Sequence, residues 1–306
     1  MERILEWKID DTASGTAIEA FLRSRGCSHH VLTHLKRTEN GIIRNGRHAW
    51  TNEHLAVGDL LQIRILETES SPGIIPVPLP LSVCYEDEDM MVINKPSDTP
   101  IHPSIHNYDN TLANGVMYYF SSKHIPFVYR CINRLDRDTS GLLIIAKNMM
   151  SGAILSRMSA SRQIHRTYLA VVEGVLPESG TIDAPIAREE DSAIMRCVDP
   201  EHGESAVTHY HRLGCYTLSG VSLSLASVHL ETGRTHQIRV HMKHIGHPLI
   251  GDFLYHPDSL HLMNRQALHS HMLAFHHPIT GELLSFTCDI PDDMQQLLKQ
   301  SDLPLL

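Results

Sequence analysis

The sequence predicts an α+β protein, in which a mixed and largely antiparallel sheet is packed against helices and follows a smaller α/β domain. Two observations support this prediction. Strand-like segments do not alternate regularly with long helices, as they would in a parallel doubly wound sheet. Residues 69–80 (ESSPGIIPVPLP) contain four prolines and a glycine, which suit neither a helix nor the middle of a sheet. We therefore predict a domain at 1–70, a linker at 71–80 and a second domain at 81–306.

The first domain combines two short helical patterns with a hairpin. Residues 16–26 (TAIEAFLRSRG) have helical spacing and end at a glycine, and residues 29–40 give a second helix. Residues 41–50 (GIIRNGRHAW) predict two strands joined by an Asn-Gly turn, and residues 59–65 a further strand. Arginines and histidines concentrate on the second helix and the hairpin, which is consistent with a small module that grips RNA.

The second domain contains more strand-like than helix-like segments. Its last long strand, residues 221–230, alternates polar and apolar side chains over several positions, which is typical of a half-exposed strand. The predicted strands are 90–94, 141–147, 167–174 and 221–230, and the predicted helices are 111–120, 149–160, 235–245 and 292–300.

Composition and charge limit the possible functions. The chain has 42% hydrophobic and 20% charged residues, and no apolar run approaches the roughly 20 residues that span a bilayer. Its first residues are too charged for a secretory signal, and its six cysteines form no C-x-x-C pair. We therefore expect a cytoplasmic protein with reduced thiols and no membrane partner.

The net charge of −9 hides two basic regions. Residues 23–47 contain six Lys or Arg and one acid, and residues 123–168 contain eight against two. By contrast, residues 173–204 contain nine acids and two arginines, as expected of a solvated face. The two basic regions favour local contact with a polyanion, although the charges could also be scattered over unrelated surfaces.

The segment INRLDRDTSGLLIIAKN, residues 132–148, contains the strongest candidate for chemistry. Asp136 lies between two arginines and ahead of an apolar strand, so we expect it to be ionised and firmly held. The segment alone leaves several interpretations open: a turn closed by Asp138 and Ser140, a phosphotransferase nucleophile loop, or a carboxylate nucleophile. An aspartic-protease site is excluded, because the required triplet and a second aspartate loop are missing.

Five further segments extend the interpretation of this motif. RLDRDTSGLLIIAK resembles the catalytic motif of the RluA-type pseudouridine synthases. Segments similar to the other motifs of that family occur along the chain in the same order as in the family. They are VINKPSDTPIHPS (92–104), HRTYLAVVEG (165–174), GESAVTHY (203–210), LETGRTHQIRVHMKHIGHPLIGD (230–252) and RQALHSHMLAFHHP (265–278). The resemblance implies a pseudouridine synthase fold over residues 81–306, and the first domain loosely resembles the alpha-L RNA-binding domain that precedes many such catalytic domains.

The resemblance also implies an activity and its residues. Enzymes of this family detach uracil from its ribose, rotate it and rejoin it through carbon 5, without a metal or other cofactor. Asp136 matches the essential aspartate, Arg239 the arginine that would pair with it, and Tyr168 the tyrosine that stacks on the uracil. The resemblance leaves open whether Asp136 attacks the base, attacks the sugar or removes a ribose proton. The expected substrate-binding residues are Arg134, which would displace the base, and Leu135, Asn94, Lys95, His102, Thr139, Gly141, Arg234, His236 and Gln237.

Asn133 and Arg166 stand where the family usually has histidine and lysine, and these changes bear on positioning more than on the reaction. The histidines at 236–247 and 269–277 lack an H-E-x-x-H motif, so we expect no metal site. We expect a monomer that acts on structured RNA, ribosomal rather than transfer RNA. The alternatives are a non-catalytic RNA-binding protein on the same scaffold and a magnesium-dependent aspartyl phosphotransferase.

Overall fold

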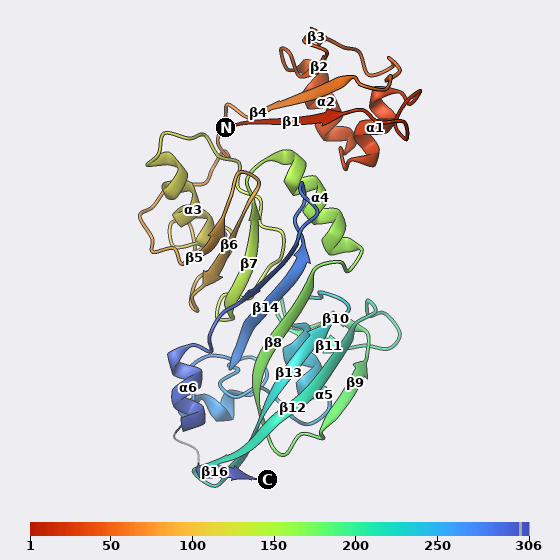
Figure 1. Cartoon of the computed structure of the whole chain (residues 1–306). Coiled ribbons are helices and arrows are strands. Elements are labelled where there is room, and N and C mark those ends of the chain that lie inside the picture. The colour runs from red at the N-terminus through yellow and green to blue at the C-terminus, as the bar shows by residue number, and fades with distance from the viewer. Residues whose placement is uncertain (300–301, 306) are drawn as a thin grey trace.

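The first domain is a four-stranded antiparallel sheet with two helices packed against it. The computed structural model describes residues 1–299 and 302–305. The sheet has the order β1-β4-β2-β3 (Figure 1). The elements are β1 (Glu2–Lys8), α1 (Ile18–Ser24), α2 (His29–Arg37), β2 (Ile42–Arg44), β3 (Arg47–His48) and β4 (Leu60–Leu66). Strand β1 was missed by the prediction, since Leu5 is its only buried residue and its apolar alternation is weak.

The second domain is built on one large sheet. In the described part of the chain this sheet has ten strands, and β10 and β11 form a separate pair. The strands are β5 (Val83–Glu86), β6 (Met90–Lys95), β7 (Ser140–Ala146), β8 (His165–Glu173), β9 (Ser179–Asp183), β10 (Ile186–Arg188), β11 (Arg196–Val198), β12 (Val207–Leu218), β13 (Val221–Leu230), β14 (Leu268–His276), β15 (Leu283–Thr287) and β16 (Asp302–Leu305). The helices are α3 (Leu112–Ser121), α4 (Met149–Ala160), α5 (Gln237–His244), the 3-10 turn η1 (Pro257–His261) and α6 (Asp292–Lys299).

The sheet is mixed and mostly antiparallel, as predicted. Its order is β16-β12-β13-β8-β14-β7-β6-β5, with β15 paired to β14 and β9 to β12. Among the strand pairs of the described residues, only β14 and β7 run parallel, over two residue pairs. The predicted strands and helices of this domain lie within two residues of the observed ones, except that residue 300 of the last helix lies outside the described residues.

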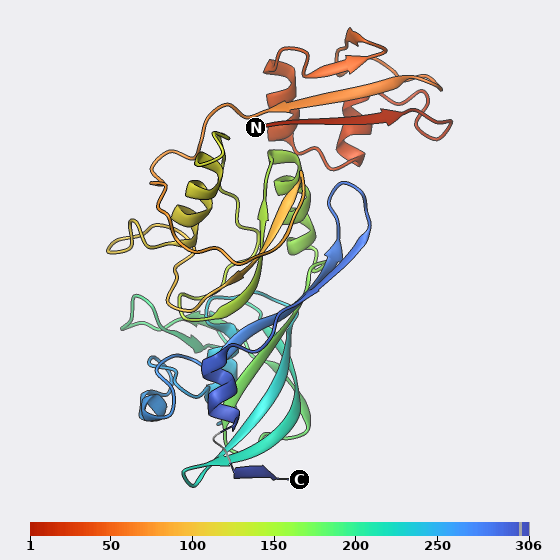
Figure 2. The same ribbon diagram turned by 60° about the vertical axis from the view of Figure 1, so that its left-hand side comes forward.

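The two domains share one hydrophobic core. In both ribbon views the first domain lies against the end of α4 (Figures 1 and 2). A single cluster of buried apolar side chains contains Leu22 and Val31 of the first domain together with Met150 and Ile154 of α4. Gly26 sits so close to α4 that a Cβ there would lie 2.5 Å from the side chain of Ile154. The first domain is therefore packed firmly on the second.

Charged groups strengthen this junction. Glu67, which is 9% exposed, forms an ion pair with Arg130 and accepts a hydrogen bond from the backbone nitrogen of Met149 at 3.2 Å. Arg3 donates two hydrogen bonds to Asp89, at 3.0 and 2.8 Å. Charge-assisted, partly buried pairs of this kind favour one relative placement of the two domains. The predicted linker at 71–80 stays a prediction, because buried side chains from both sides of it belong to one hydrophobic cluster.

The proline-rich segment between β4 and β5 contains no helix or strand, but it is not a free tether. The backbone nitrogen of Ser71 donates to the carbonyl of Phe127, and that of Val77 to the carbonyl of Asn114. The side chain of Asn114 in turn donates to the carbonyl of Ile75 at 2.7 Å. These bonds hold the segment along α3 and along the irregular stretch around Phe127.

A cleft opens beside the central strands of the large sheet. Four parts of the chain surround it: the loop that leads into β7, the end of α4 with the loop after it, the start of β8, and the connection from β13 to α5. Strands β8 and β13 pair along seven residues, so the connection after β13 is held beside the start of β8. In the described residues, no helix is long and apolar enough to cross a membrane.

Candidate active site

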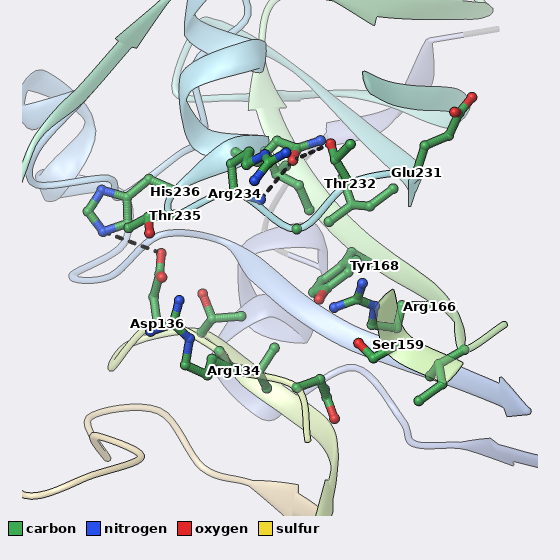
Figure 3. A pocket seen from close by; sticks show the side chains of 18 of the residues that line it. Arg134, Asp136, Ser159, Arg166, Tyr168, Glu231, Thr232, Arg234, Thr235 and His236 are labelled. Atoms are coloured by element: carbon green, nitrogen blue, oxygen red, sulfur yellow. Dashed lines mark hydrogen bonds and ion pairs between the residues drawn. The ribbon is translucent and has the colours of Figure 1, made fainter. Parts of the chain in front are cut away.

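The cleft has a volume of about 670 Å³ and brings together most of the predicted residues. Asp136, Tyr168 and Arg239 all line it, although they come from three separate parts of the chain. Figure 3 shows Asp136 and Arg134 on one side of the cleft, and Tyr168 and Arg166 on β8 on the other. Of the predicted binding residues, the cleft is lined by Arg134, Leu135, Thr139, Arg234, His236 and Gln237.

Backbone carbonyls anchor the loop that carries Asp136. The amide of Thr139 donates to the carbonyl of Asp136 at 3.1 Å, which closes a turn. The ammonium of Lys95 donates to the carbonyl of Arg137 at 2.8 Å, and the guanidinium of Arg265 donates to the carbonyl of Asp138 at 3.1 Å. Because carbonyls take these bonds, the carboxylate of Asp136 stays free to face the cleft.

Arg239 joins two carboxylates. Its Nε and Nη2 donate to the two oxygens of Asp252 at 2.7 and 2.8 Å, which is the bidentate geometry of a strong charge-assisted pair. Its Nη1 donates to Oδ2 of Asp136 at 2.9 Å. Arg239 is 2% exposed, and although burial opposes its charge, the hydrogen bonds and charges of Asp252 and Asp136 raise its pKa above the ordinary value. The predicted pairing of Asp136 with Arg239 is therefore present in the structure.

His236 approaches Asp136 from the start of α5. Its backbone is left-handed, with φ of 57°, and its Nε2 lies 3.8 Å from Oδ2 of Asp136 (Figure 3). Its Nδ1 lies 2.9 Å from the hydroxyl of Tyr255, which orients the ring. Burial lowers the pKa of His236 below its ordinary value, although the charge of Asp136 opposes this shift. At neutral pH the ring is therefore mainly neutral and offers a polar neighbour to Asp136.

Tyr168 forms part of the wall opposite Asp136. It is 4% exposed, and burial raises the pKa of its phenol above the ordinary value. Arg166 lies two residues earlier on β8, and side chains two apart on a strand project from the same face. The start of β8 therefore presents an aromatic ring and a guanidinium side by side to the cleft.

The cleft matches a known family. Residues 89–244 match the family model of RNA pseudouridylate synthases. The chain is 38% identical over 283 residues to the Bacillus subtilis (strain 168) protein named "Uncharacterized RNA pseudouridine synthase YjbO", covering 92% of this chain and 98% of that protein. The chain belongs to the RNA pseudouridine synthase family. It is an isomerase of uridine in RNA, which confirms the predicted activity.

Two further similarities agree with this assignment. The synthase is 38% identical to "Ribosomal large subunit pseudouridine synthase D" of Haemophilus influenzae (strain ATCC 51907 / DSM 11121 / KW20 / Rd), over 80% of this chain and 78% of that protein. Its fold resembles the solved structure titled "Human RNA Pseudouridylate Synthase Domain Containing 1" with a TM-score of 0.61 and 27% identity, covering 77% and 91% of the two chains. The predicted pseudouridine synthase fold is confirmed.

Four predicted binding residues of the synthase do not line the cleft. Lys95 is wholly buried beneath the loop of Asp136, where it donates to the carbonyls of Pro96 and Arg137, and burial lowers its pKa to about 7. Gly141 has φ of +112°, and a Cβ there would lie 2.3 Å from the carbonyl oxygen of Ser270. It is a close-packing position of the sheet.

The other two lie outside the cleft for similar reasons. Asn94 precedes Lys95 on β6 and points to the other face of that strand, which is not the cleft side. The ring of His102 packs edge-on against Tyr129 with centroids 5.2 Å apart. Its pKa is lowered by burial and by the charge of Arg134, so it lies near the cleft without lining it.

Two of the predicted residues that do line the cleft have structural partners. Gln237, 2% exposed, donates to the carbonyl of Val207 at 3.0 Å and to the hydroxyl of Thr208 at 2.9 Å, and it holds the turn before α5. Arg234 donates to the carbonyl of Ser205 at 3.0 Å and pairs with Glu204. These bonds shape the connection between β13 and α5, so much of their hydrogen-bonding capacity is already used.

Two important residues were missed by the sequence analysis. Asp252 is completely buried and holds Arg239 in place, and Tyr255 bonds to His236 while its ring centroid lies 5.0 Å from the guanidinium of Arg239. Asp252 closes one of the segments that carried the family resemblance, so its position there was the available signal. No pattern in the sequence marked Tyr255.

The histidine-rich segments have protein partners. His241, buried in α5, hydrogen-bonds to the hydroxyl of Thr208 and the carbonyl of Ala184, both at 2.8 Å. In the described residues, one group could hold a metal, and it combines His277 of the second segment with Asp87 and Asp89. His277 already bonds to Asp87 at 2.8 Å, and Asp89 is engaged by Arg3, so this group ties β5, β6 and the end of β14 together.

Proposed function

We propose that this synthase isomerises uridines in large-subunit ribosomal RNA, with Asp136 as its essential carboxylate and Arg239 and Tyr168 as its catalytic partners. One observation carries the assignment of residues: Oδ2 of Asp136 is held at 2.9 Å by a buried arginine while its carboxylate faces a cleft large enough for a nucleoside. The proposed RNA follows relatives named for the large ribosomal subunit, including the Haemophilus influenzae protein.

The reaction defines what the cleft must do. The bond between uracil N1 and ribose C1′ breaks, the base turns, and a new bond joins C5 to C1′. The hydrogen on C5 leaves to solvent and N1 gains one, so the product is an isomer of the substrate. The cleft must therefore hold the ribose still, keep the detached base inside and let it rotate.

Asp136 supplies a fixed anionic oxygen beside the breaking bond. Arg239 keeps this oxygen oriented, and because Arg239 is itself clamped by Asp252, it needs no rearrangement when charge changes during the reaction. His236, near the same oxygen, adds a polar neighbour without a full charge. This arrangement serves an attack by Asp136 or a proton abstraction equally well.

Tyr168 supplies a stacking surface and a protonated hydroxyl. A raised pKa leaves the phenol uncharged at neutral pH. Tyr168 is therefore better suited to donate a hydrogen bond or to stack on a base than to act as a strong base. A buried aromatic wall is suited to the face of a detached uracil, because stacking tolerates rotation of the base.

Entry of the uridine requires it to leave its stack. This extrusion costs a few kcal/mol in structured RNA, and a side chain that fills the gap lowers the cost. Arg134 lines the cleft two residues before Asp136 and is exposed to solvent, which suits this role. The first domain would contact flanking RNA through exposed cationic and aromatic side chains: His29, His30, Lys36, Arg37, Arg47, His48 and Trp50.

A tritium-release assay tests the activity and the role of Asp136 together. Total cellular RNA labelled with tritium on uracil C5 is incubated with the protein in EDTA, and released tritium is counted. We expect release by the wild type and none by Asp136→Asn, which conserves the shape of the side chain. Folding of the variant is checked by its urea denaturation curve.

The same assay separates the alternatives. A protein that releases no tritium but forms a labile aspartyl phosphate when magnesium is present would support the phosphotransferase interpretation. The fold does not favour that interpretation, because a buried strand should precede its nucleophile loop and here β7 follows the loop. Full activity of Asp136→Asn would overturn the proposed role of that residue. Mapping pseudouridine in RNA from cells with and without the gene identifies the target, and pseudouridine lost only from transfer RNA would refute the ribosomal assignment.

The remaining expectations concern its location and assembly. We propose that the synthase acts in the cytoplasm as a monomer, as its composition and the size of its shared core suggest. Analytical ultracentrifugation at micromolar concentration measures the second point, and a dimer would contradict it.

A further inference from the structure

We propose that Arg166 binds a phosphate of the RNA strand beside the target uridine, so that the outer part of the cleft is a phosphate subsite. This inference rests on the proposed function only in requiring that RNA enters the cleft. The family resemblance gives Arg166 no role, and it stands where the family usually has a lysine.

The ion pairs of the cleft single out Arg166. Five arginines line the cleft, and three of them are paired with carboxylates: Arg162 with Glu231, Arg234 with Glu204, and Arg239 with Asp136 and Asp252. Arg134 and Arg166 have no acidic partner among the described residues. The chain carries a net charge of −9, so acidic side chains are plentiful. Two cleft arginines without a carboxylate partner therefore point to an external anion at this place.

Arg166 differs from Arg134 in its burial. Arg134 is exposed to water, whereas Arg166 is only partly exposed and its Nε is wholly buried without a hydrogen-bond partner. A partly desolvated guanidinium with an unpaired donor is unfavourable in the free protein, and a ligand with several strong acceptors removes that cost. The guanidinium also lies next to Gly233, where a Cβ would be 3.6 Å from Nη2, so the side chain packs against the connection to α5.

The position of Arg166 relative to Tyr168 defines which part of a nucleotide it meets. The two side chains leave the same face of β8 with their Cα atoms separated by about 7 Å. If the uracil stacks on Tyr168, Arg166 lies at the distance of a backbone phosphate of the same or the adjacent nucleotide. Ser159 of α4 lines the same part of the cleft, and its hydroxyl is a second candidate donor (Figure 3).

A phosphate fits this site better than a base edge. A guanidinium fork matches two phosphate oxygens in a bidentate geometry, which a lysine ammonium cannot reproduce. A phosphate is present beside every nucleotide, so the contact would hold any target uridine in register without reading its neighbours. Arg166 would therefore set the depth at which the uridine sits between Tyr168 and Asp136.

Salt dependence provides the test. Binding and turnover of protein-free large-subunit ribosomal RNA are measured for the wild type, Arg166→Met and Arg166→Lys over a range of potassium concentrations, with binding measured in an Asp136→Asn background to prevent turnover. Loss of one phosphate contact lowers the slope of log K against log salt by about 0.7 for single-stranded RNA. We expect this change in Arg166→Met, with KM and Kd raised roughly tenfold at low salt and kcat changed much less.

Arg166→Lys separates charge from geometry. It should retain the salt slope of the wild type, because its charge remains, and should recover only part of the affinity, because the fork is lost. Arg188→Met is the matched control, since Arg188 is exposed on β10 and does not line the cleft. It should leave the salt slope, KM and kcat of the wild type unchanged.

The alternative is that Arg166 acts through Tyr168, whose pKa its charge helps to lower against the effect of burial. In that case Arg166→Met would reduce kcat, shift its pH profile and leave the salt slope unchanged, which would overturn the phosphate subsite. A wild type that forms no pseudouridine in any cellular RNA would instead refute the proposed function, and the binding slopes would still report on Arg166.

Discussion

The two ends of the cleft differ in how their charges are satisfied. At the inner end, formed by Asp136, Arg239 and Asp252, every charged group has a partner in the protein at hydrogen-bond distance. At the outer end, formed by Arg134 and Arg166, neither guanidinium has an acidic partner among the described residues. The inner end is complete before substrate arrives, and the outer end is completed by substrate.

This difference separates chemistry from recognition. A catalytic carboxylate must be held in one position, since a displacement of about 1 Å can cost on the order of 100-fold in rate. A site that binds RNA benefits from arginines whose charge is not neutralised by a protein carboxylate, because these arginines attract and orient the RNA backbone. Substitutions of the buried ion pair at the inner end should therefore affect stability and rate together, whereas those at the outer end should affect the interaction with RNA and leave stability nearly unchanged.

The largest loss of stability is expected for Asp252→Asn. Asp252 is fully buried and takes two hydrogen bonds from Arg239, so the amide would leave a buried guanidinium partly uncompensated. Removing one partner of a buried ion pair costs about 3–5 kcal/mol. We expect the free energy of unfolding from urea denaturation to fall by this amount, and the single-turnover rate to fall about 100-fold because Arg239 no longer orients Asp136.

Asp136→Asn is the comparison for this variant. The side chain of Asp136 is 27% exposed, and Arg239 keeps its pair with Asp252 when Asp136 is neutral. Asp136→Asn should therefore lose activity with less than about 1 kcal/mol of stability. If Asp252→Asn proved as stable as the wild type, the ion pair between Asp252 and Arg239 would not stabilise the inner end of the cleft.

A smaller change in stability, which depends on pH, is expected for Lys95→Met. Burial lowers the pKa of Lys95 to about 7, against about 10.4 in an unfolded chain. Between these values the unfolded state binds a proton that the folded state does not, so this residue makes the folded state progressively more stable as pH rises. Below about pH 7 both states are protonated and its contribution is constant.

The measurement compares the wild type with Lys95→Met in urea at several pH values between about 6 and 9. The stability of the wild type relative to the variant should be flat below pH 7 and rise above it by at most about 1.4 kcal/mol per pH unit. A neutral amine still has two N–H donors for the carbonyls of Pro96 and Arg137, so the support of the loop persists. A pH-independent difference would show that Lys95 does not titrate in this range.

The sequence predicted the helices, four strands of the second domain and the main pair of the site, but not the residues that support this pair. Asp136 and Arg239 could be paired because each lies in a distinct motif of the family. The strand 90–94 was also predicted, yet Asn94 and Lys95 were both expected to bind the substrate, although neighbouring residues on a strand face opposite sides. Extending that strand by one residue would have shown that at most one of them could point into the cleft.

The remaining supports depend on tertiary contacts that leave no local pattern. Asp252 and Tyr255 follow α5 in an irregular segment, and their partners Arg239 and His236 are at least 13 residues away. The shared core of the two domains was hidden for a similar reason. The prolines of residues 71–80 predicted irregular chain, which the structure has there, but they could not show that α4 packs against Leu22 and Val31.

The smallest effect is expected for Arg134→Gln, and it depends on the RNA. Arg134 is exposed and unpaired, so its replacement should change the free energy of unfolding by no more than about 0.5 kcal/mol. If Arg134 fills the gap left by an extruded uridine, the variant should lose roughly tenfold in kcat/KM on a stem-loop substrate. It should lose much less on an unstructured oligonucleotide of the same sequence, where extrusion costs little. Equal losses on both substrates would make Arg134 a general backbone contact like the one proposed for Arg166, and the outer end would then serve binding without helping to open the RNA.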